Sequence, residues 1–265
     1  MRNEELPFGP VTRLSIRSHN VVWGIAAIGS GVRVFVPDLR GFGANHPEEW
    51  PDPSLDLMAD DIAELLTANN FARAVVAGMS MGGYVALAFA ERHRSRLAGL
   101  GLISTQAGAD TGEARVARRA MIENVKANGP KVAAEALLPK LFSDANAKNT
   151  DFQAFVWNGA EQAGIKGICW ALEGMARRPD RTQLLRDLEL PILIVHGMED
   201  KLIPIDKIRP LAQECARDSF VQVRGAGHAT PIEVPDAVAQ GLLRLVNSTR
   251  PVSALEDAKS NESAR

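Results

Sequence analysis

The serine at position 80 stands between two unlike runs, and this junction limits the folds open to the chain more than any other feature. Residues 74–77 are apolar and partly β-branched, whereas residues 84–90 are good helix formers, so Ser80 is expected at a strand-to-helix turn. The surrounding pentapeptide, GMSMG at 78–82, has the G-x-S-x-G pattern of a nucleophile elbow. Such a turn strains the serine backbone and leaves no room for side chains at its two glycines. A glycine-rich turn that only joins a strand to a helix is the alternative interpretation.

The overall composition excludes several classes of protein. The 265 residues are 46% hydrophobic and 23% charged, as in an ordinary globular protein, and the net charge of −2 gives no reason to expect nucleic acid or a membrane as partner. No apolar stretch reaches the length of a transmembrane helix, and the first residues do not resemble a signal peptide. Cys169 and Cys215 show no metal or redox spacing and are expected to be free thiols. We therefore expect a cytoplasmic protein with no bound metal; the composition predicts no oligomeric state.

Strand-like and helix-like segments alternate along most of the chain. Buried strands are predicted at 32–36, 73–77, 98–103, 191–195 and 220–223. Helices are predicted at 55–66, from residue 80 onward, at 205–217 and at 236–247. This alternation predicts an α/β fold, a mostly parallel sheet with helices on both faces.

Residues 105–185 interrupt the alternation with helical segments at 113–127, 130–142 and 165–177. We interpret this region as a helical cap inserted into a core that comprises residues 1–104 and 186–249. Residues 250–265 are nearly free of large apolar side chains and are expected to form a disordered tail. The pair Gly41-x-Gly43 is followed by Pro47 and not by a helix, which argues against a dinucleotide-binding fingerprint and leaves no cofactor predicted.

A serine hydroxyl becomes a useful nucleophile only when a nearby base takes its proton, and histidine has the suitable pKa. Of the five histidines, His228 is preferred because it follows a glycine-rich loop after the last predicted strand. His93 lies among charged residues of a helix and is expected to be solvated, and His46 lies in a loop. His196 ends a strand and is assigned a structural hydrogen bond, while His19 is not placed.

The base needs an acid that orients it, and that acid should follow a strand end. Asp200, which follows the strand at 191–195, is the preferred candidate; its neighbour Glu199 is expected to point elsewhere. Asp110, after the strand at 98–103, is the weaker alternative. The chain order Ser80, Asp200, His228 gives nucleophile, acid and base in the order typical of the α/β-hydrolase fold.

From Val34 to Val246 the sequence resembles a cap-bearing α/β hydrolase of the esterase, enol-lactonase and cofactor-free haloperoxidase group. The resemblance rests on PDLRGFG at 37–43, GMSMGG at 78–83, Gly197-x-x-Asp200 and Gly225-x-Gly227-His228. It implies hydrolysis of a small carboxylic ester or lactone through an acyl-serine, with the backbone N–H of Met81 as one oxyanion donor. Two alternatives stay open: a catalytically impaired homologue retained for binding, and acyl transfer, perhydrolysis or C–C bond hydrolysis by the same triad.

The N-terminal region departs from this family pattern. The family places a strand that ends in His-Gly, and supplies a second oxyanion N–H, between the strands that match 32–36 and 73–77; no His-Gly precedes residue 32 here. Either residues 11–16 fill that slot, or the sheet closes without a strand there. Residues 10–21 can also be read as an out-of-frame translation of a family-like stretch, VLLHGFPFDHTMW, with the frame restored before Val32. The fold is thus predicted to be N-terminally incomplete and the protein a weak catalyst.

Overall fold

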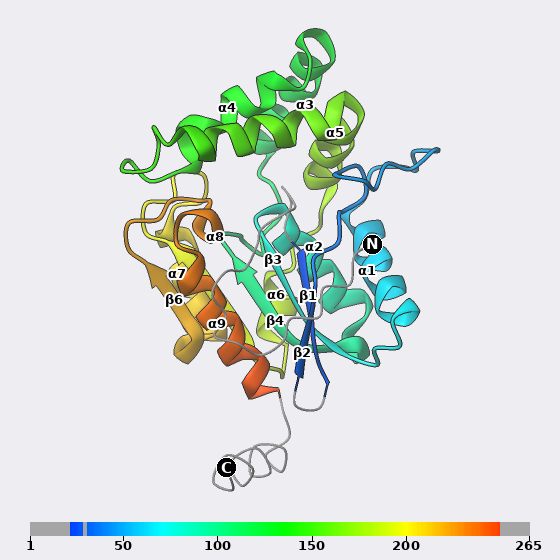
Figure 1. Cartoon of the computed structure of the whole chain (residues 1–265), viewed down its shortest axis with the longest axis vertical. Coiled ribbons are helices and arrows are strands. Elements are labelled where there is room, and N and C mark those ends of the chain that lie inside the picture. The colour runs from blue at the N-terminus through cyan, green and yellow to red at the C-terminus, as the bar shows by residue number, and fades with distance from the viewer. Residues whose placement is uncertain (1–21, 29–30, 250–265) are drawn as a thin grey trace, which may run out of the picture.

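The computed structural model describes residues 22–28 and 31–249, and in this part of the chain a six-stranded sheet is flanked by helices (Figure 1). The strands are β1 (Val22–Ile28), β2 (Gly31–Phe35), β3 (Ala74–Met79), β4 (Leu97–Ile103), β5 (Ile192–Gly197) and β6 (Phe220–Val223). Their order across the sheet is β2-β1-β3-β4-β5-β6, and β3 to β6 are mutually parallel. The predicted α/β class and the five predicted strands are confirmed.

The slot between β2 and β3 is filled by β1, which was not predicted. Gly24 of β1 lies opposite Phe35 of β2 on one side and opposite Val76 of β3 on the other, and both pairings are antiparallel. The expectation that either residues 11–16 fill this slot or no strand does is therefore wrong. A parallel strand here would need a long crossover before β2, whereas an antiparallel strand needs only a short hairpin connection. Residues 11–16 themselves, and the out-of-frame hypothesis for 10–21, lie outside the described residues.

Helices pack on both faces of the sheet, and the alternation of side chains along β3 shows how. Val76 belongs to an apolar cluster that includes residues of α1, α2 and α7, whereas Val75 and Ala77 pack with residues of α9. The helices of the sheet region are α1 (Leu55–Ala68), α2 (Met81–Arg92), α7 (Ile205–Cys215), α8 (Thr230–Glu233) and α9 (Pro235–Ser248), with short 3₁₀ turns η1 (Arg94–Arg96) and η2 (Arg217–Ser219). Among the described helices, none combines the length and the apolar character that a membrane crossing needs.

The segment between β4 and β5 is helical, and its three long helices lie as a layer over one end of the sheet (Figure 1). Its helices are α3 (Gly112–Asn128), α4 (Lys131–Leu141), α5 (Thr150–Arg177) and α6 (Thr182–Arg186). Within α5 the backbone of Gly164 is not helical, with φ 63° and ψ −176°, so α5 consists of two helices joined at a kink. The predicted helix at 165–177 is the second of these. The tail at 250–265 lies outside the described residues.

Candidate active site

Ser80 occupies the sharp turn between β3 and α2. Its φ of 51° and ψ of −116° are unusual for a residue other than glycine, and such strain is characteristic of functional turns. Neighbouring groups hold this conformation: the Ser80 N–H donates to the carbonyl oxygen of Ile103 at 2.9 Å, and Thr105 Oγ1 donates to the Ser80 carbonyl oxygen at 2.8 Å. The backbone therefore has the shape that the G-x-S-x-G pattern predicts.

The glycines of the turn are required by close contacts, with backbone at Gly78 and with a side chain at Gly83. A Cβ atom on Gly78 would lie 2.0 Å from the carbonyl oxygen of Gly82, and a Cβ atom on Gly83 would lie 2.4 Å from Cγ2 of Thr105. The clash at Gly78 is with backbone, which cannot move without displacing the start of α2. The expected need for glycine at position 78 is confirmed.

Gly78→Ala is expected to destabilise the protein by about 3 kcal/mol, because the added methyl group must push β3 and α2 apart. The matched control is Gly112→Ala at the start of α3, where an added Cβ would meet no atom within 4 Å. The free energies of unfolding in urea would be compared. Equal stability of the two variants would contradict the tight packing of this turn.

The side chains of Ser80, His228 and Asp200 form a continuous hydrogen-bonded chain. His228 Nε2 lies 2.8 Å from Ser80 Oγ, and His228 Nδ1 lies 2.8 Å from Asp200 Oδ2. Ser80 follows β3, Asp200 follows β5, and His228 follows β6, so the parallel strands bring all three to the same edge of the sheet. An ionised carboxylate can only accept, so Nδ1 carries the imidazole proton and Nε2 is free to accept the Ser80 hydroxyl proton.

Asp200 is held in its ionised form. Its side chain is fully buried, and burial alone would raise its pKa, but hydrogen bonds from His196, from His228 and from the Ile203 N–H outweigh burial and hold the pKa well below its usual range. Oδ1 accepts from the backbone N–H groups of Leu202 and Ile203 at 2.9 and 2.8 Å. Four donors thus surround one carboxylate, which fixes its orientation toward the imidazole.

The other described histidines lie in different surroundings. His196 Nε2 is 2.7 Å from the Ile203 carbonyl oxygen, as a structural role predicts, and also 3.2 Å from Asp200 Oδ2. His93 is not simply solvated, because its Nε2 lies 2.7 Å from a carboxylate oxygen of Asp60. His46 is exposed in its loop, and His19 lies outside the described residues.

The two other acids considered from the sequence do not contact His228. Asp110 forms ion pairs with Arg118 and Arg178. Glu199 accepts from the N–H of Asp144 at 3.3 Å and so points away from the imidazole, as expected. Asp200 is thus the acid that the structure brings to His228.

Met81 is the first residue of α2, directly after Ser80. A backbone N–H in the first turn of a helix has no acceptor within that helix, so the Met81 N–H is free to bind an anion. Its side chain is buried and lines the same cavity as Ser80. This geometry is suited to an oxyanion donor.

Glu233 supports the His228 loop, and sequence reasoning did not identify it. Its Oε1 accepts from the N–H of Gly227 at 2.7 Å, and its Oε2 accepts from the N–H of Ser143 at 2.8 Å and from Asn146 Nδ2 at 3.0 Å. One carboxylate therefore ties the histidine loop to the chain segment that follows α4. The position of Glu233 soon after His228 is the only signal in the sequence, and no motif marks it.

Glu233→Ala is expected to lower kcat by about tenfold to a hundredfold, because a small displacement of His228 weakens its alignment with Ser80. The unfolding free energy should fall by about 1–3 kcal/mol, since partly buried N–H groups lose their acceptor. Glu214→Ala is the control, because Glu214 forms an exposed ion pair with Arg186 and touches neither loop. If the two variants had equal kcat, Glu233 would have no role in positioning His228.

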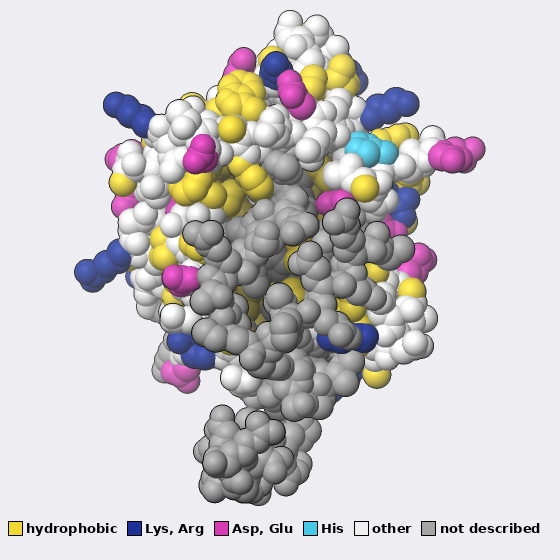
Figure 2. Space-filling model, in the orientation of Figure 1, with side chains coloured by type: hydrophobic (Ala, Val, Ile, Leu, Met, Phe, Trp, Pro, Cys, Tyr) yellow, Lys and Arg dark blue, Asp and Glu magenta, His cyan; other side chains and the backbone are white. Residues whose placement is uncertain are grey.

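A cavity of about 830 Å³ opens onto Ser80 and His228 beneath the helical layer. Its walls from α3, α4 and α5 are mainly apolar, and Figure 2 shows hydrophobic side chains gathered along the lower border of that layer. The ionisable side chains that line it are Tyr84, Asp110, Arg118, Lys207 and His228. Residues of α3–α5 in the wall include Met121, Ala134, Leu137, Phe155, Ala163, Ile168, Leu172 and Met175.

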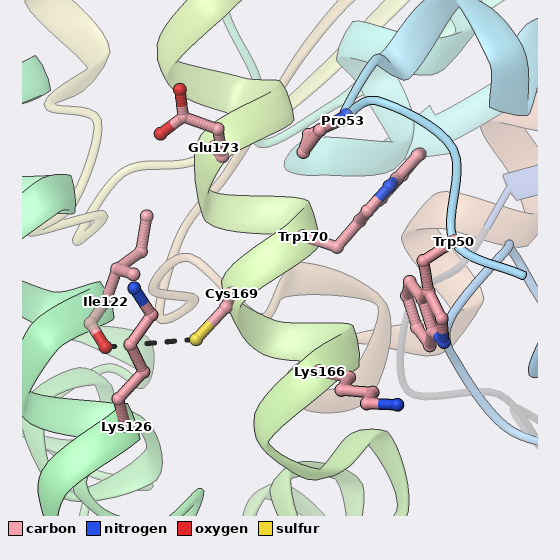
Figure 3. A pocket seen from close by; sticks show the side chains of 8 residues that line it. All are labelled: Trp50, Pro53, Ile122, Lys126, Lys166, Cys169, Trp170 and Glu173. Atoms are coloured by element: carbon pink, nitrogen blue, oxygen red, sulfur yellow. Dashed lines mark hydrogen bonds between the residues drawn. The ribbon is translucent and has the colours of Figure 1, made fainter.

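A second hollow of about 490 Å³ lies between the two tryptophans Trp50 and Trp170 and helix α3 (Figure 3). It shares no lining residue with the first cavity, so it is separate from Ser80. Its one thiol, that of Cys169, points toward the carbonyl oxygen of Ile122 at 3.8 Å, and burial raises the pKa of this thiol. Across the described residues no group of three or more metal-binding side chains is found. The Ser80 cavity is therefore the candidate active site.

Comparison with known proteins agrees with this fold and site. The sequence model of the α/β hydrolase fold family matches residues 16–235. A solved structure of a thermophilic esterase from Thermogutta terrifontis is 35% identical, with a TM-score of 0.78 over 84% of this chain and 82% of that chain. The AB hydrolase superfamily protein YisY of Bacillus subtilis is 28% identical over 82% of each chain. The 3-oxoadipate enol-lactonase 1 of Acinetobacter baylyi is 27% identical over 82% of this chain and 79% of its own.

This chain belongs to the α/β hydrolase fold family and is an enzyme of that family. The resemblance predicted from its motifs is confirmed.

Proposed function

We propose that this protein is a serine hydrolase that cleaves a small carboxylic ester or lactone through an acyl-serine intermediate. The observation that carries the proposal is the chain of two 2.8 Å hydrogen bonds from buried Asp200 through His228 to Ser80. The similarity of this chain to an esterase and to an enol-lactonase supports cleavage of an ester bond. No other nucleophile in the described cavity has a base within hydrogen-bonding distance.

In the first half-reaction, Ser80 Oγ attacks the carbonyl carbon while His228 Nε2 takes the hydroxyl proton. The carbonyl oxygen becomes an oxyanion that accepts a hydrogen bond from the Met81 N–H at the positive end of α2. The tetrahedral intermediate then collapses, and His228 gives its proton to the departing alkoxide. The ionised Asp200 stabilises the imidazolium between these two transfers.

In the second half-reaction, water replaces the alcohol and the same groups act again. His228 takes a proton from the water as its oxygen attacks the acyl carbon, and returns that proton to Ser80 Oγ when the acid is released. The two steps together consume one water and yield one acid and one alcohol, or one hydroxy acid from a lactone. Asp200 keeps the imidazole in the required tautomer throughout.

The segment at 105–185 is proposed to act as a cap domain over a core formed by the residues before 105 and at 186–249. Its support is that α3, α4 and α5 furnish the apolar wall of the cavity, so these helices would contact the substrate. A mainly apolar wall that excludes water also strengthens the hydrogen bonds to the oxyanion.

The impaired-homologue alternative is less well supported than catalysis. A chain that had lost its activity would not need a strained serine, a free helix N–H and an ionised acid aligned with one imidazole. Acyl transfer, perhydrolysis and C–C bond hydrolysis use the same triad, so they are distinguished by the acceptor and the substrate and not by these three residues.

Two measurements test the proposal. A fluorophosphonate probe should label the native protein and fail to label Ser80→Ala, since only an activated serine reacts efficiently. A hydrolysis screen over p-nitrophenyl esters and lactones should then identify the acyl chain that is cleaved. Absence of both labelling and turnover would favour the impaired homologue, and labelling at another residue would overturn the assignment of Ser80.

A further inference from the structure

Two arginines share one carboxylate in the wall of the active-site cavity. Arg178 Nη1 lies 2.7 Å from Asp110 Oδ1, and Arg118 Nε bonds to Asp110 Oδ2. Asp110 is held ionised: burial alone would raise its pKa, but the hydrogen bonds and charges of Arg118 and Arg178 lower it. The three side chains together therefore carry one unbalanced positive charge.

Arg178 and Asp110 already make a complete pair. The side chain of Arg178 is 2% exposed, it donates to the carbonyl oxygens of Met175 and Gly108 at 2.8 and 3.1 Å, and its guanidinium stacks on the ring of Tyr84 at 3.9 Å. A buried carboxylate needs one counter-charge, and Arg178 supplies it. Arg118 also bonds to Asp110, through Nε and, at 3.4 Å, through Nη2, so the excess positive charge belongs to the two arginines together; of the two, Arg118 is the one that lines the cavity.

Arg118 is placed to use that charge on a ligand. Its side chain lines the cavity that contains Ser80 and is 22% exposed, and within the described part of the chain no acceptor bonds to its Nη1. The other ionisable residues of the cavity wall, apart from His228, are Asp110, already paired, Tyr84, whose pKa is raised by burial, and Lys207 on the exposed face of α7. The cavity therefore presents excess positive charge and planar guanidinium donors inside an otherwise mainly apolar space.

We propose that Arg118 binds a carboxylate of the substrate, so that the preferred substrates are esters or lactones that carry a free acid group. A guanidinium presents paired N–H donors that match a carboxylate, and the pairing is strongest where apolar walls exclude water. This inference rests on the proposed function and adds to it the chemical class of the substrate. The alternative role for Arg118 is structural, an anchor that joins α3 to the loop of Asp110.

The test compares matched acidic and neutral esters. Monoethyl glutarate is paired with ethyl pentanoate to place the acid on the acyl side, and para-acetoxybenzoate is paired with para-acetoxybenzamide to place it on the alcohol side. For one of these pairs, the native enzyme should show a higher kcat/KM for the acidic member. Arg118→Gln should lower that ratio of acidic to neutral kcat/KM by at least about tenfold, because a charge-assisted pair is lost. Arg118→Lys keeps the charge but loses the paired N–H donors, so its ratio should lie between those of the native enzyme and of Arg118→Gln.

Arg119→Gln is the control, because Arg119 is the exposed neighbour of Arg118 on the same helix and does not line the cavity. It removes the same charge from the chain and should keep the native ratio. Arg118→Gln leaves the Asp110–Arg178 pair balanced, so we expect it to fold; a melting curve checks this, and Arg118→Lys replaces it if it does not.

The outcomes separate this inference from the proposed function. Turnover of neutral esters with no preference for either acidic member would overturn the carboxylate site and leave the hydrolase assignment standing. If no ester is turned over, the carboxylate site is tested by the change in melting temperature when glutarate is added. A rise in the native protein and in Arg119→Gln that is absent in Arg118→Gln supports the site. An equal rise in all three, or none in the native protein, overturns it.

Discussion

Replacing Ser80 by alanine is expected to reduce kcat for any ester substrate by roughly 10⁴-fold to 10⁶-fold, because the covalent intermediate cannot form. His228→Ala should be equally severe, since the serine and its base act as one unit. Among the described residues, Ser80 Oγ forms a hydrogen bond with His228 alone, so its removal should change the free energy of unfolding by less than about 1 kcal/mol. Turnover and urea unfolding would be measured on the same preparations.

Ser248→Ala serves as the control for Ser80→Ala. Ser248 lies at the end of α9, where its hydroxyl donates to the carbonyl oxygen of Leu245, and its loss should leave turnover at the native level. Native turnover in Ser80→Ala, with the fold intact, would show that the nucleophile lies elsewhere.

Asp200→Asn is expected to lower kcat by roughly 10³-fold to 10⁴-fold. A carboxamide carries no charge to stabilise the imidazolium, and its NH₂ group can turn toward His228 and impose the wrong tautomer. The hydrogen bonds from Leu202 and Ile203 to the remaining oxygen should keep the loop in place. The measurement is kcat on the best ester from the substrate screen.

Asp110→Asn provides the comparison, because Asp110 was the alternative acid and is also a buried, ion-paired carboxylate in the same cavity. Its contacts are with arginines and not with His228, so its effect on kcat should be much smaller than that of Asp200→Asn. The reverse order of severity would move the role of orienting acid to the loop after β4.

The parts of this fold that were predicted correctly are those set by local patterns. The five β-branched or apolar runs became strands; β3, β4 and β5 are almost wholly buried, whereas the described side chains of the edge strands β2 and β6 are mostly half-buried. Ser80 was placed correctly because an elbow has a short and specific pattern. Asp200 and His228 lie beside Ser80 in the structure because all three follow parallel strands, and the carboxyl ends of such strands meet at one edge of the sheet. The helices at 113–127 and 130–142 followed from helix propensity alone.

What was missed depends on contacts between distant parts of the chain. β1 contains Gly24, Ala26 and Ala27, which have low strand propensity, and its pairing with β3 determines its place. Glu233 carries no motif: besides Gly227, its partners Ser143 and Asn146 lie about ninety residues earlier. Such contacts leave no periodicity in the sequence and emerge only with the tertiary structure.

The reversed direction of β1 has a consequence for the order in which the sheet can assemble. β1 and β2 are consecutive in the chain and paired, so their contacts are local and a hairpin of this kind forms in about 1–10 μs. A parallel strand in the same slot could pair with its neighbour only after a long crossover connection had formed. The isolated hairpin is only marginally stable, so it gains its stability on docking against β3, across the loop that contains α1. β1, which pairs with the strand that leads into the nucleophile turn, can thus join the sheet as half of a hairpin that forms before the rest of the sheet.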